Sequence, residues 1–256
     1  MCYERDASPP VLAGTGSVGH AGRLALRSDD GTPFGAFEAQ PADAARAAVL
    51  ILPDVRGLHP YYEELTCRFA EHGYHGLAID YFGRTVGTAV DRPDGFEYHE
   101  HVNATTLDGL TADIRAGASY LRGAELKPAN LFTIGFCFGG RLSFLATTFG
   151  LDLTASIGLH AGLGARNELP APADRAGDMR APLLGIFGGA DPSIPPADID
   201  AFDAALSAAG VEHRFVTLEG APHSFFDRKF DEFASQSAEA WREVLAFLEA
   251  RTSIAA

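Results

Sequence analysis

A cysteine, an aspartate and a histidine occur in the chain order of a nucleophilic hydrolase site. Cys137 is the centre of a G-x-C-x-G motif, Asp191 ends a Gly-Gly-Ala-Asp segment, and His223 ends a Gly-Ala-Pro-His segment. A thiol nucleophile needs a base that takes its proton, and the base needs an acid that orients its ring. The order nucleophile, acid, histidine therefore predicts covalent catalysis by a Cys-His-Asp triad.

The G-x-C-x-G motif is typical of a nucleophile elbow in which cysteine replaces serine. The nucleophile of an elbow occupies a tight, strained turn between a strand and a helix, so its neighbours two positions away must lack side chains. Cys137 would then lie at a helix N-terminus, where the macrodipole favours the thiolate. The backbone N–H of Phe138 would point at the developing oxyanion.

Each of the three residues also has an ordinary structural interpretation. Cys137 could be a buried, inert cysteine, Asp191 could cap the helix that follows it, and His223 could be a loop histidine bonded to backbone. The combined pattern favours a catalytic role over these structural roles, because all three positions have the expected chain order, the expected residue type and the expected place after a strand.

Alternating strands and helices must position these residues. Short apolar segments predict strands at residues 47–52, 75–79, 131–134, 155–159, 183–187 and 213–218. Apolar residues at helical spacing predict helices between them and a final helix around residues 241–248. Such units form a mostly parallel sheet with helices on both faces, and ligands bind at the carboxyl ends of its strands.

The N-terminal part of the chain has a different pattern. Residues 1–20 are rich in Gly, Pro and Ser and are predicted to form a loose or surface-wrapped extension. Two short alternating segments, at 23–27 and 34–38, flank an Asp-Gly turn signal and predict an antiparallel hairpin. Residues 21–256 are predicted to form one α/β domain, since neither a repeat nor a shift in composition marks a second one.

The composition argues against several classes of protein. The 256-residue chain has a formal net charge of -14, which disfavours binding to nucleic acid or to an anionic membrane. Its three cysteines show neither a disulfide framework nor metal-ligand spacing, so neither a metal nor a cofactor is expected. Residues 1–10 lack the apolar region of a signal peptide, and no apolar run would span a bilayer. We expect a cytoplasmic monomer or homodimer whose partner is a small molecule.

Five segments together resemble the dienelactone hydrolase (carboxymethylenebutenolidase) family of the α/β-hydrolases. The resemblance extends from about Leu24 to Leu248. The segments are Leu50 to Gly57, Asp80 to Arg84, Gly135 to Gly140, Gly188 to Asp191 and Gly220 to Phe225. This resemblance implies a single-domain α/β-hydrolase fold and the hydrolysis of an ester or a lactone.

The resemblance also implies roles for individual residues. Cys137, Asp191 and His223 would be the triad, and Val55 and Phe138 would donate the two oxyanion-hole N–H groups. Asp54 stands where the family often has a glutamate that is taken to accept the thiol proton. Because aspartate is one methylene shorter, the alternative for Asp54 is a polar strand-end residue that bonds the next loop.

The substrate-binding residues match the family less closely. Its best-known members hold a substrate carboxylate with two arginines, whereas here the matching loop position holds His99, with Arg92 nearby, and Arg228 lies one residue later than expected. The candidates for substrate binding are Arg84, Arg92, Arg228, Tyr81, Phe82 and His160. The arginines could instead tether loops, and His160 could be a strand-end histidine with satisfied hydrogen bonds.

The thiol nucleophile restricts the class of ester that the site could hydrolyse. A thiolate derives from an acid of pKa about 8.5, so a tetrahedral adduct of a plain alkyl ester would expel the thiolate rather than the alkoxide. An enol lactone or an aryl ester has a better leaving group. The sequence thus predicts hydrolysis of an activated ester or lactone through an acyl-thioester. The alternatives are a general carboxylesterase or thioesterase, and a non-catalytic ligand-binding protein of the same fold.

Overall fold

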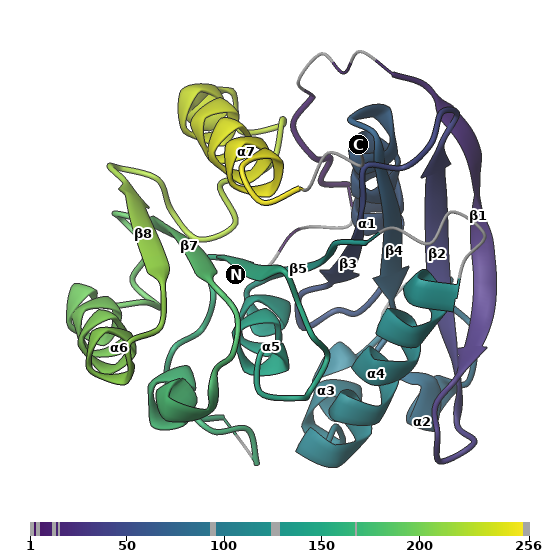
Figure 1. The fold of residues 1–256 in the computed structure, drawn as a ribbon, viewed down its shortest axis with the longest axis horizontal. Helices are drawn as coiled ribbons and strands as arrows, with labels where there is room; N and C mark the ends of the chain where they lie inside the picture. The colour runs from purple at the N-terminus through teal and green to yellow at the C-terminus, as the bar shows by residue number, and fades with distance from the viewer. Residues whose placement is uncertain are drawn as a thin grey trace.

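A single eight-stranded sheet forms the centre of the protein (Figure 1). The computed structural model describes residues 3, 6–11, 14, 16–92, 96–123, 129–166 and 168–252. The strand order is β1-β2-β4-β3-β5-β6-β7-β8. The strands are β1 (Val18–Arg27), β2 (Pro33–Pro41), β3 (Ala47–Leu52), β4 (Tyr74–Ile79), β5 (Leu131–Phe136), β6 (Ala155–Leu159), β7 (Leu183–Gly188) and β8 (His213–Leu218).

The sheet is mostly parallel, with an antiparallel pair at its N-terminal edge. Strands β4, β3, β5, β6, β7 and β8 pair in parallel, whereas β1 pairs with β2 and β2 with β4 in antiparallel register. Gly31 closes the β1–β2 turn at a φ of 86°, a conformation that glycine adopts without steric cost. The predictions of a parallel sheet and an N-terminal hairpin are confirmed.

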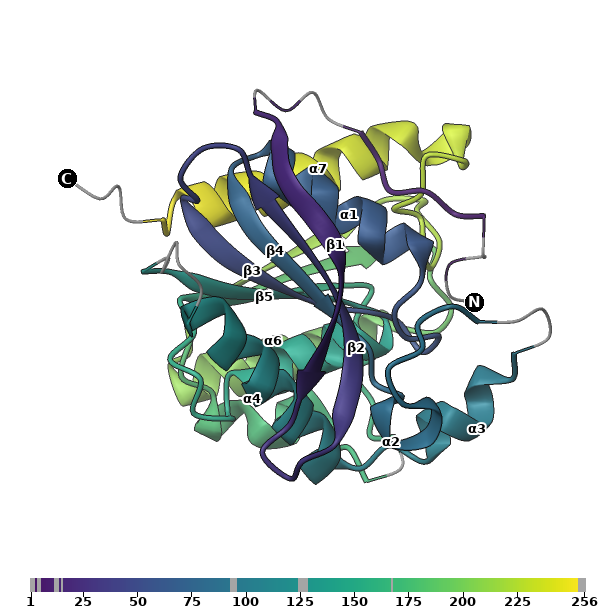
Figure 2. The same ribbon diagram turned by 90° about the vertical axis from the view of Figure 1, so that its right-hand side faces the viewer.

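Helices cover both faces of the sheet (Figure 2). Helices α1 (Pro60–Glu71) and α7 (Ala234–Glu249) pack on one face, and α4 (Leu107–Gly123), α5 (Phe138–Ala146) and α6 (Pro196–Ala209) on the other. Successive strand residues point to opposite faces, so Val49 and Ile51 pack beneath α1 while Leu50 and Leu52 pack beneath α4 and α5. This double burial is why the strand sequences are continuously apolar.

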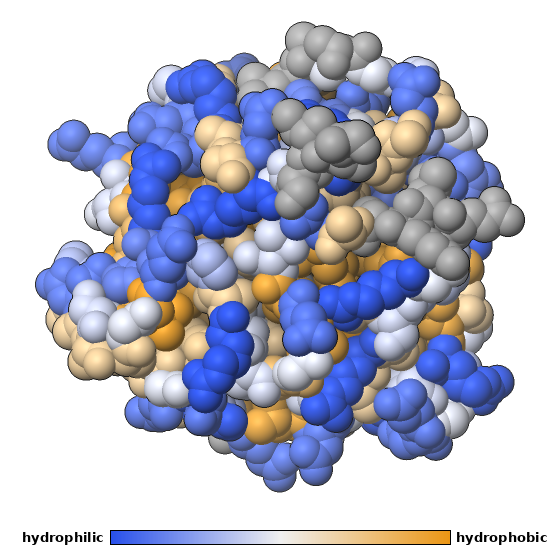
Figure 3. All heavy atoms as spheres, in the orientation of Figure 1, coloured by the Kyte–Doolittle hydropathy of each residue, from blue (hydrophilic) through white to orange (hydrophobic). Residues whose placement is uncertain are grey.

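The segment between β4 and α4 contains two short helices. These are α2 (Gly83–Val86) and α3 (Tyr98–Asn103). Two short 3₁₀ helices, η1 (Pro172–Asp178) and η2 (Asp231–Phe233), lie in other connections. No helix in the described ranges is long and apolar enough to cross a membrane. Figure 3 shows one face of the molecule, where hydrophilic side chains separate the apolar residues into small patches.

The described part of the N-terminal segment packs against the domain. Tyr3, Ala7, Pro9 and Pro10 are buried, so a loose extension is wrong for these residues, which pack on the domain. The N–H of Ser8 donates to Asp227 Oδ1 at 3.0 Å, and the N–H of Arg228 donates to the Ser8 carbonyl at 2.9 Å. The segment therefore bonds to the loop that follows β8, on the site side of the sheet.

Candidate active site

Cys137 occupies a strained turn between β5 and α5. Its φ of 54° and ψ of -109° are unfavourable for a residue with a side chain. Its N–H donates to the Leu159 carbonyl at 3.1 Å, and its own carbonyl accepts hydrogen bonds from the N–H groups of Arg141 and Gly162, both at 3.2 Å. Three backbone hydrogen bonds thus hold the nucleophile candidate in its turn, at the N-terminus of α5.

The glycines of the motif are required by close backbone approaches. A Cβ atom on Gly135 would lie 1.9 Å from the Gly139 carbonyl oxygen. A Cβ atom on Gly139 would lie 2.0 Å from the carbonyl oxygen of Leu52, at the end of β3. Neither position can carry a side chain without moving the backbone. The same contact presses the elbow against the loop that follows β3.

His223 and Asp191 form a hydrogen-bonded pair on the loops that follow β8 and β7. The distance from His223 Nδ1 to Asp191 Oδ2 is 2.5 Å. The other oxygen, Oδ1, accepts the N–H of Ser193 at 2.8 Å. Burial alone would raise the pKa of Asp191, but the hydrogen bonds from His223 and Ser193 outweigh it and lower that pKa. Asp191 is therefore an ionised acceptor that orients the imidazole and leaves Nε2 as the nitrogen that would exchange a proton.

The two loops that carry this pair are bonded to each other. The N–H of Gly189 donates to the Leu218 carbonyl at 2.8 Å, and the N–H of Ala190 donates to the Ala221 carbonyl at 3.0 Å. A Cβ atom on Gly188 would lie 2.3 Å from that Ala221 oxygen. The Gly-Gly-Ala-Asp segment is thus needed for close packing of the β7 loop on the β8 loop, which sets the His223–Asp191 geometry.

His160 connects the elbow with the histidine loop. It follows Leu159, whose carbonyl holds the Cys137 N–H, and its ring centroid lies 4.8 Å from that of His223 in an edge-to-face arrangement. Cys137 and His223 therefore both lie next to the end of β6. The carboxyl ends of β5, β6, β7 and β8 meet at this edge, as expected for the ligand-binding edge of a parallel sheet.

Val55 and Phe138 carry the two N–H groups that the sequence assigns to an oxyanion hole. Val55 lies in the turn after β3, which Gly57 closes by donating its N–H to the Asp54 carbonyl at 3.1 Å. Within the ranges that the structure describes, neither the Val55 N–H nor the Phe138 N–H donates a hydrogen bond. Because the elbow packs directly on the end of β3 through Gly139, both donors belong to the same corner of the molecule.

Residues 34–252 match the sequence model of the dienelactone hydrolase family. The chain belongs to this family. It is 28% identical over 230 residues to the "Putative carboxymethylenebutenolidase" of Methylorubrum extorquens, an alignment that covers 88% of this chain and 79% of that protein. It is 25% identical over 176 residues to the "Carboxymethylenebutenolidase" of Pseudomonas putida, which covers 67% and 72% of the two chains.

A crystal structure titled as a putative dienelactone hydrolase, from Klebsiella pneumoniae, has the same fold. It superposes with a TM-score of 0.75 at 26% identity and covers 89% of this chain and 97% of that chain. Family membership makes this chain a carboxylic ester hydrolase of the α/β-hydrolase fold.

Asp54, where the dienelactone hydrolase family often has a glutamate, is fully buried and bonded through both carboxylate oxygens. Oδ1 accepts the N–H of Arg56 at 2.8 Å, and Oδ2 accepts the N–H of Tyr3 at 3.3 Å. Burial raises the pKa of Asp54 to about 6, although the Arg56 N–H opposes this shift. These are the contacts of a strand-end residue that bonds neighbouring segments. A role as acceptor of the thiol proton stays a prediction.

The three arginines that the sequence offers as substrate ligands all have carboxylate partners. Arg84 pairs with Asp113 and Asp30, Arg92 with Asp80, and Arg228 with Glu64. The ion pairs of Arg84 and Arg228 join segments that are far apart in the chain, and the Arg92–Asp80 pair joins two residues of one loop. The contacts are therefore those of residues that tether loops, which is the alternative that the sequence left open.

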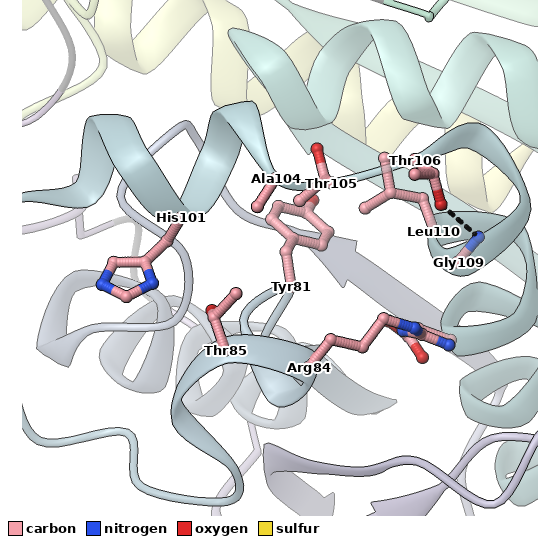
Figure 4. A pocket seen from close by; sticks show the side chains of 10 residues that line it. Tyr81, Arg84, Thr85, His101, Ala104, Thr105, Thr106, Gly109 and Leu110 are labelled. Carbon is pink, nitrogen blue, oxygen red and sulfur yellow. Dashed lines mark hydrogen bonds and ion pairs between the residues drawn. The ribbon is translucent and has the colours of Figure 1, made fainter.

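The aromatic candidates of this dienelactone hydrolase family member lie on the β3 and β4 side of the elbow. The Tyr81 ring meets the Phe138 ring edge-on at 5.5 Å, and its hydroxyl donates to the Pro53 carbonyl at 3.0 Å. Tyr81 also lines a narrow crevice with Thr85, His101 and others (Figure 4). Tyr81 thus lies beside the elbow, whereas Phe82 is buried against Phe96 and His101.

His160 differs from its expected state. It is fully buried at a φ of 36°, and both ring nitrogens lack a hydrogen-bond partner within the described ranges. The prediction of a strand-end histidine with satisfied hydrogen bonds is therefore wrong. Burial, together with the nearby His223, lowers the pKa of His160 well below its usual value, so the ring is neutral. The neutral ring adds no charge of its own next to the His223–Asp191 pair.

Two residues near the site were missed by the sequence reasoning. Tyr3 is one, because nothing in the N-terminal sequence marks it as buried beside Asp54. Arg141 is the other, and a signal for it exists: it lies one helical turn after Cys137 and directly follows the G-x-C-x-G-G segment.

Proposed function

We propose that this protein hydrolyses an activated ester or lactone through Cys137, His223 and Asp191, with a covalent acyl-thioester intermediate. One observation supports the proposal most strongly. Cys137 occupies a strained turn that requires glycine on both sides, and this turn lies at the same sheet edge as the His223–Asp191 hydrogen bond of 2.5 Å. Backbone strain of this kind costs about 1–3 kcal/mol and persists where function requires it. An inert structural cysteine has no need of such a turn.

In the proposed reaction, Cys137 transfers its proton to His223 Nε2 and its sulfur forms a bond with the substrate carbonyl carbon. The N–H groups of Val55 and Phe138 bind the resulting oxyanion. When the carbon–oxygen bond to the leaving group breaks, His223 returns the proton to that oxygen. A water molecule then gives a proton to His223 and attacks the thioester, and the released thiolate recovers the proton. Asp191 holds the imidazole tautomer throughout.

The proposed substrate is a small molecule with a good leaving group. The Cys137 thiolate leaves a tetrahedral adduct more readily than an alkoxide does, so productive turnover needs an enol or a phenol as leaving group. The dienelactone of the family name meets this requirement, because ring opening releases an enol. The cytoplasmic location and the oligomeric state, monomer or homodimer, stay predictions.

The test compares wild type, Cys137→Ala and Cys67→Ala on 4-nitrophenyl acetate, a dienelactone, an alkyl ester and a thioester. We expect Cys137→Ala to lower kcat/KM by at least about 10³-fold, while Cys67→Ala, which removes a half-buried thiol of α1, keeps wild-type rates. Iodoacetamide should label Cys137 and abolish activity in proportion to labelling.

Activity that survives in Cys137→Ala would reject the cysteine mechanism. Rates on the alkyl ester or the thioester that match those on the aryl ester would reject the preference for activated esters and favour a general carboxylesterase or thioesterase.

A further inference from the structure

Arg141 is a buried cation beside Cys137 that has no acidic partner among the described residues. Only 6% of the residue is exposed. Its Nε–H donates to the Gly162 carbonyl at 3.0 Å, while Nη1 is buried and has no hydrogen-bond partner in the described part of the chain. Since a buried charge is costly unless it is paired, the guanidinium has unused hydrogen-bonding capacity.

Arg166 is a second arginine at this place, and the part of the chain that the structure describes offers it no carboxylate partner. Its guanidinium carbon lies 6.0 Å from the centroid of the Phe138 ring, next to the elbow. Its backbone is fixed by a pair of hydrogen bonds with Leu169, at 3.0 and 2.9 Å. Among the described residues, no Asp or Glu lies within ion-pair distance of Arg166 or Arg141.

Arg141 is held against Cys137 by the backbone of the elbow and of the loop after β6. The Cys137 carbonyl accepts the N–H groups of Arg141 and of Gly162, and Gly162 in turn accepts the side chain of Arg141. This corner follows β6, whereas the loop of Val55 follows β3 on the other side of β5. The arginines therefore flank the elbow on the side opposite to the second oxyanion donor.

The two positive charges act on each other. Burial and, to a smaller extent, the charge of Arg166 together lower the pKa of Arg141 to about 10, while Cys137 acts in the opposite direction. Arg84, Arg92 and Arg228 differ in this respect, because each of them pairs with an acid, whereas no described acid of this chain, whose net charge is -14, pairs with Arg141 or Arg166. An oxyanion ligand would relieve the repulsion and fill the free donors, since guanidinium groups bind carboxylates in bidentate geometry.

We propose that Arg141 and Arg166 form an anion-binding subsite on the β6 side of Cys137, which selects substrates that carry a carboxylate or another oxyanion group. This inference rests on the proposed function, because it names the kind of ester or lactone that the site would take. It places the anion on α5 and the loop after β6, on residues other than the three arginines that the sequence offered.

The test uses two pairs of substrates that differ only in one negative charge. Mono-4-nitrophenyl adipate is compared with 4-nitrophenyl hexanoate, which varies the acyl side. The second pair, 4-acetoxybenzoate and its methyl ester, varies the leaving-group side. Wild type is expected to prefer the anionic member of at least one pair. Arg166→Gln should lower that preference, measured as the ratio of kcat/KM values, about tenfold or more.

Arg175→Gln is the matched control. It removes the same charge from η1 nearby, where Arg175 already pairs with Asp178, and should leave the ratio unchanged. Because the Arg141 side chain also bonds to Gly162, its replacement disturbs the local backbone, so the test uses Arg166, which is only partly buried. A ratio that is the same in wild type and Arg166→Gln for both pairs, with activity on the neutral esters intact, would overturn the subsite.

A binding measurement separates this inference from the proposed function. Adipate and, in a separate series, sulfate are titrated by calorimetry into wild type, Arg166→Gln and Arg175→Gln. Binding that Arg166→Gln weakens about tenfold supports the subsite even if no ester is turned over, and the tighter of the two anions identifies the oxyanion. Equal binding to all three proteins, or none to wild type, contradicts the subsite.

Discussion

The two sides of the candidate active site are built in different ways. On one side, Cys137, Asp191 and His223 each lie within a few residues of the end of their own strand, and neighbouring loops bond to each other. On the other side, Asp54 and Val55 follow β3 and are held from outside by the N-terminal segment. The first side is thus determined by local sequence, whereas the second depends on a contact between positions 3 and 54.

The external contact on the β3 side is extensive for a single residue. The Tyr3 ring stacks on Tyr61 at 4.1 Å between centroids and meets the His160 ring edge-on at 5.6 Å. Its N–H bonds to Asp54, and its carbonyl accepts the side chain of Arg56. Tyr3 therefore packs between the turn that carries Val55 and the buried His160 ring, which lies next to His223.

The largest expected effect tests the first side. Asp191→Asn keeps the shape of the side chain but removes the charge that stabilises the imidazolium and fixes its tautomer. We expect kcat on 4-nitrophenyl acetate to fall by about 10³- to 10⁴-fold with little change in the melting temperature. Steady-state kinetics and thermal unfolding of the purified variant measure both.

Asp203→Asn provides the control for this change, because Asp203 forms the same kind of pair with His213, at 3.1 Å, on the exposed end of β8. It should retain wild-type kcat. If both variants lost activity equally, the loss in Asp191→Asn would not report on the triad.

The contrast between the two sides explains what the sequence could predict. The elbow residues Gly135, Cys137 and Gly139 are close in the chain. The turn has no room for side chains at positions 135 and 139, and the glycines there reveal this requirement in the sequence. Asp191 and His223 each follow a predicted strand. Because these strands alternate with helices, they are parallel and their carboxyl ends lie at one edge of the sheet, so the two side chains could be expected to lie close together. In both cases, the chain connectivity carries the information.

Other features depend on contacts between distant segments and could not be predicted. The N-terminal sequence around Tyr3 has no periodic apolar pattern, so the burial of Tyr3 depends on its contacts with Tyr61 and Asp54. Likewise, an arginine in sequence does not reveal its partner. Arg92 meets Asp80 and Arg141 meets no acid in the described ranges only because of how the loops pack.

A substitution at Tyr3 tests the second side. Tyr3→Ala removes a buried aromatic ring and should lower the free energy of unfolding by about 3 kcal/mol. It should also lower kcat/KM about tenfold, because the turn that carries the Val55 N–H loses its outer support. Urea denaturation and kinetics on 4-nitrophenyl acetate check the two effects.

Tyr3→Phe keeps the stacking on Tyr61 and is the conservative counterpart. The Tyr3 hydroxyl is buried without a hydrogen-bond partner among the described residues, so its loss should cost little in stability or in rate. Wild-type stability and kinetics in Tyr3→Ala would show that the N-terminal segment does not support the site.

The smallest expected effect concerns Asp54 and depends on pH. Its pKa of about 6 in the folded chain exceeds the value of about 3.9 in an unfolded chain, so the folded state binds the proton more tightly. The contribution of Asp54 to stability therefore falls as the pH rises from about 4 to about 6, and the loss persists above pH 6. Asp54→Asn cannot ionise and lacks this loss.

We expect the stability of Asp54→Asn relative to wild type to improve by about 2–3 kcal/mol between pH 4 and pH 7, as measured by urea denaturation at each pH. Using the difference between the two proteins cancels groups such as Asp191, whose lowered pKa acts in the opposite direction. Because backbone N–H groups occupy both Asp54 oxygens, kcat/KM should change less than tenfold. A loss comparable to that of Asp191→Asn would instead show that Asp54 accepts the thiol proton, and the β3 side would then take part in proton transfer.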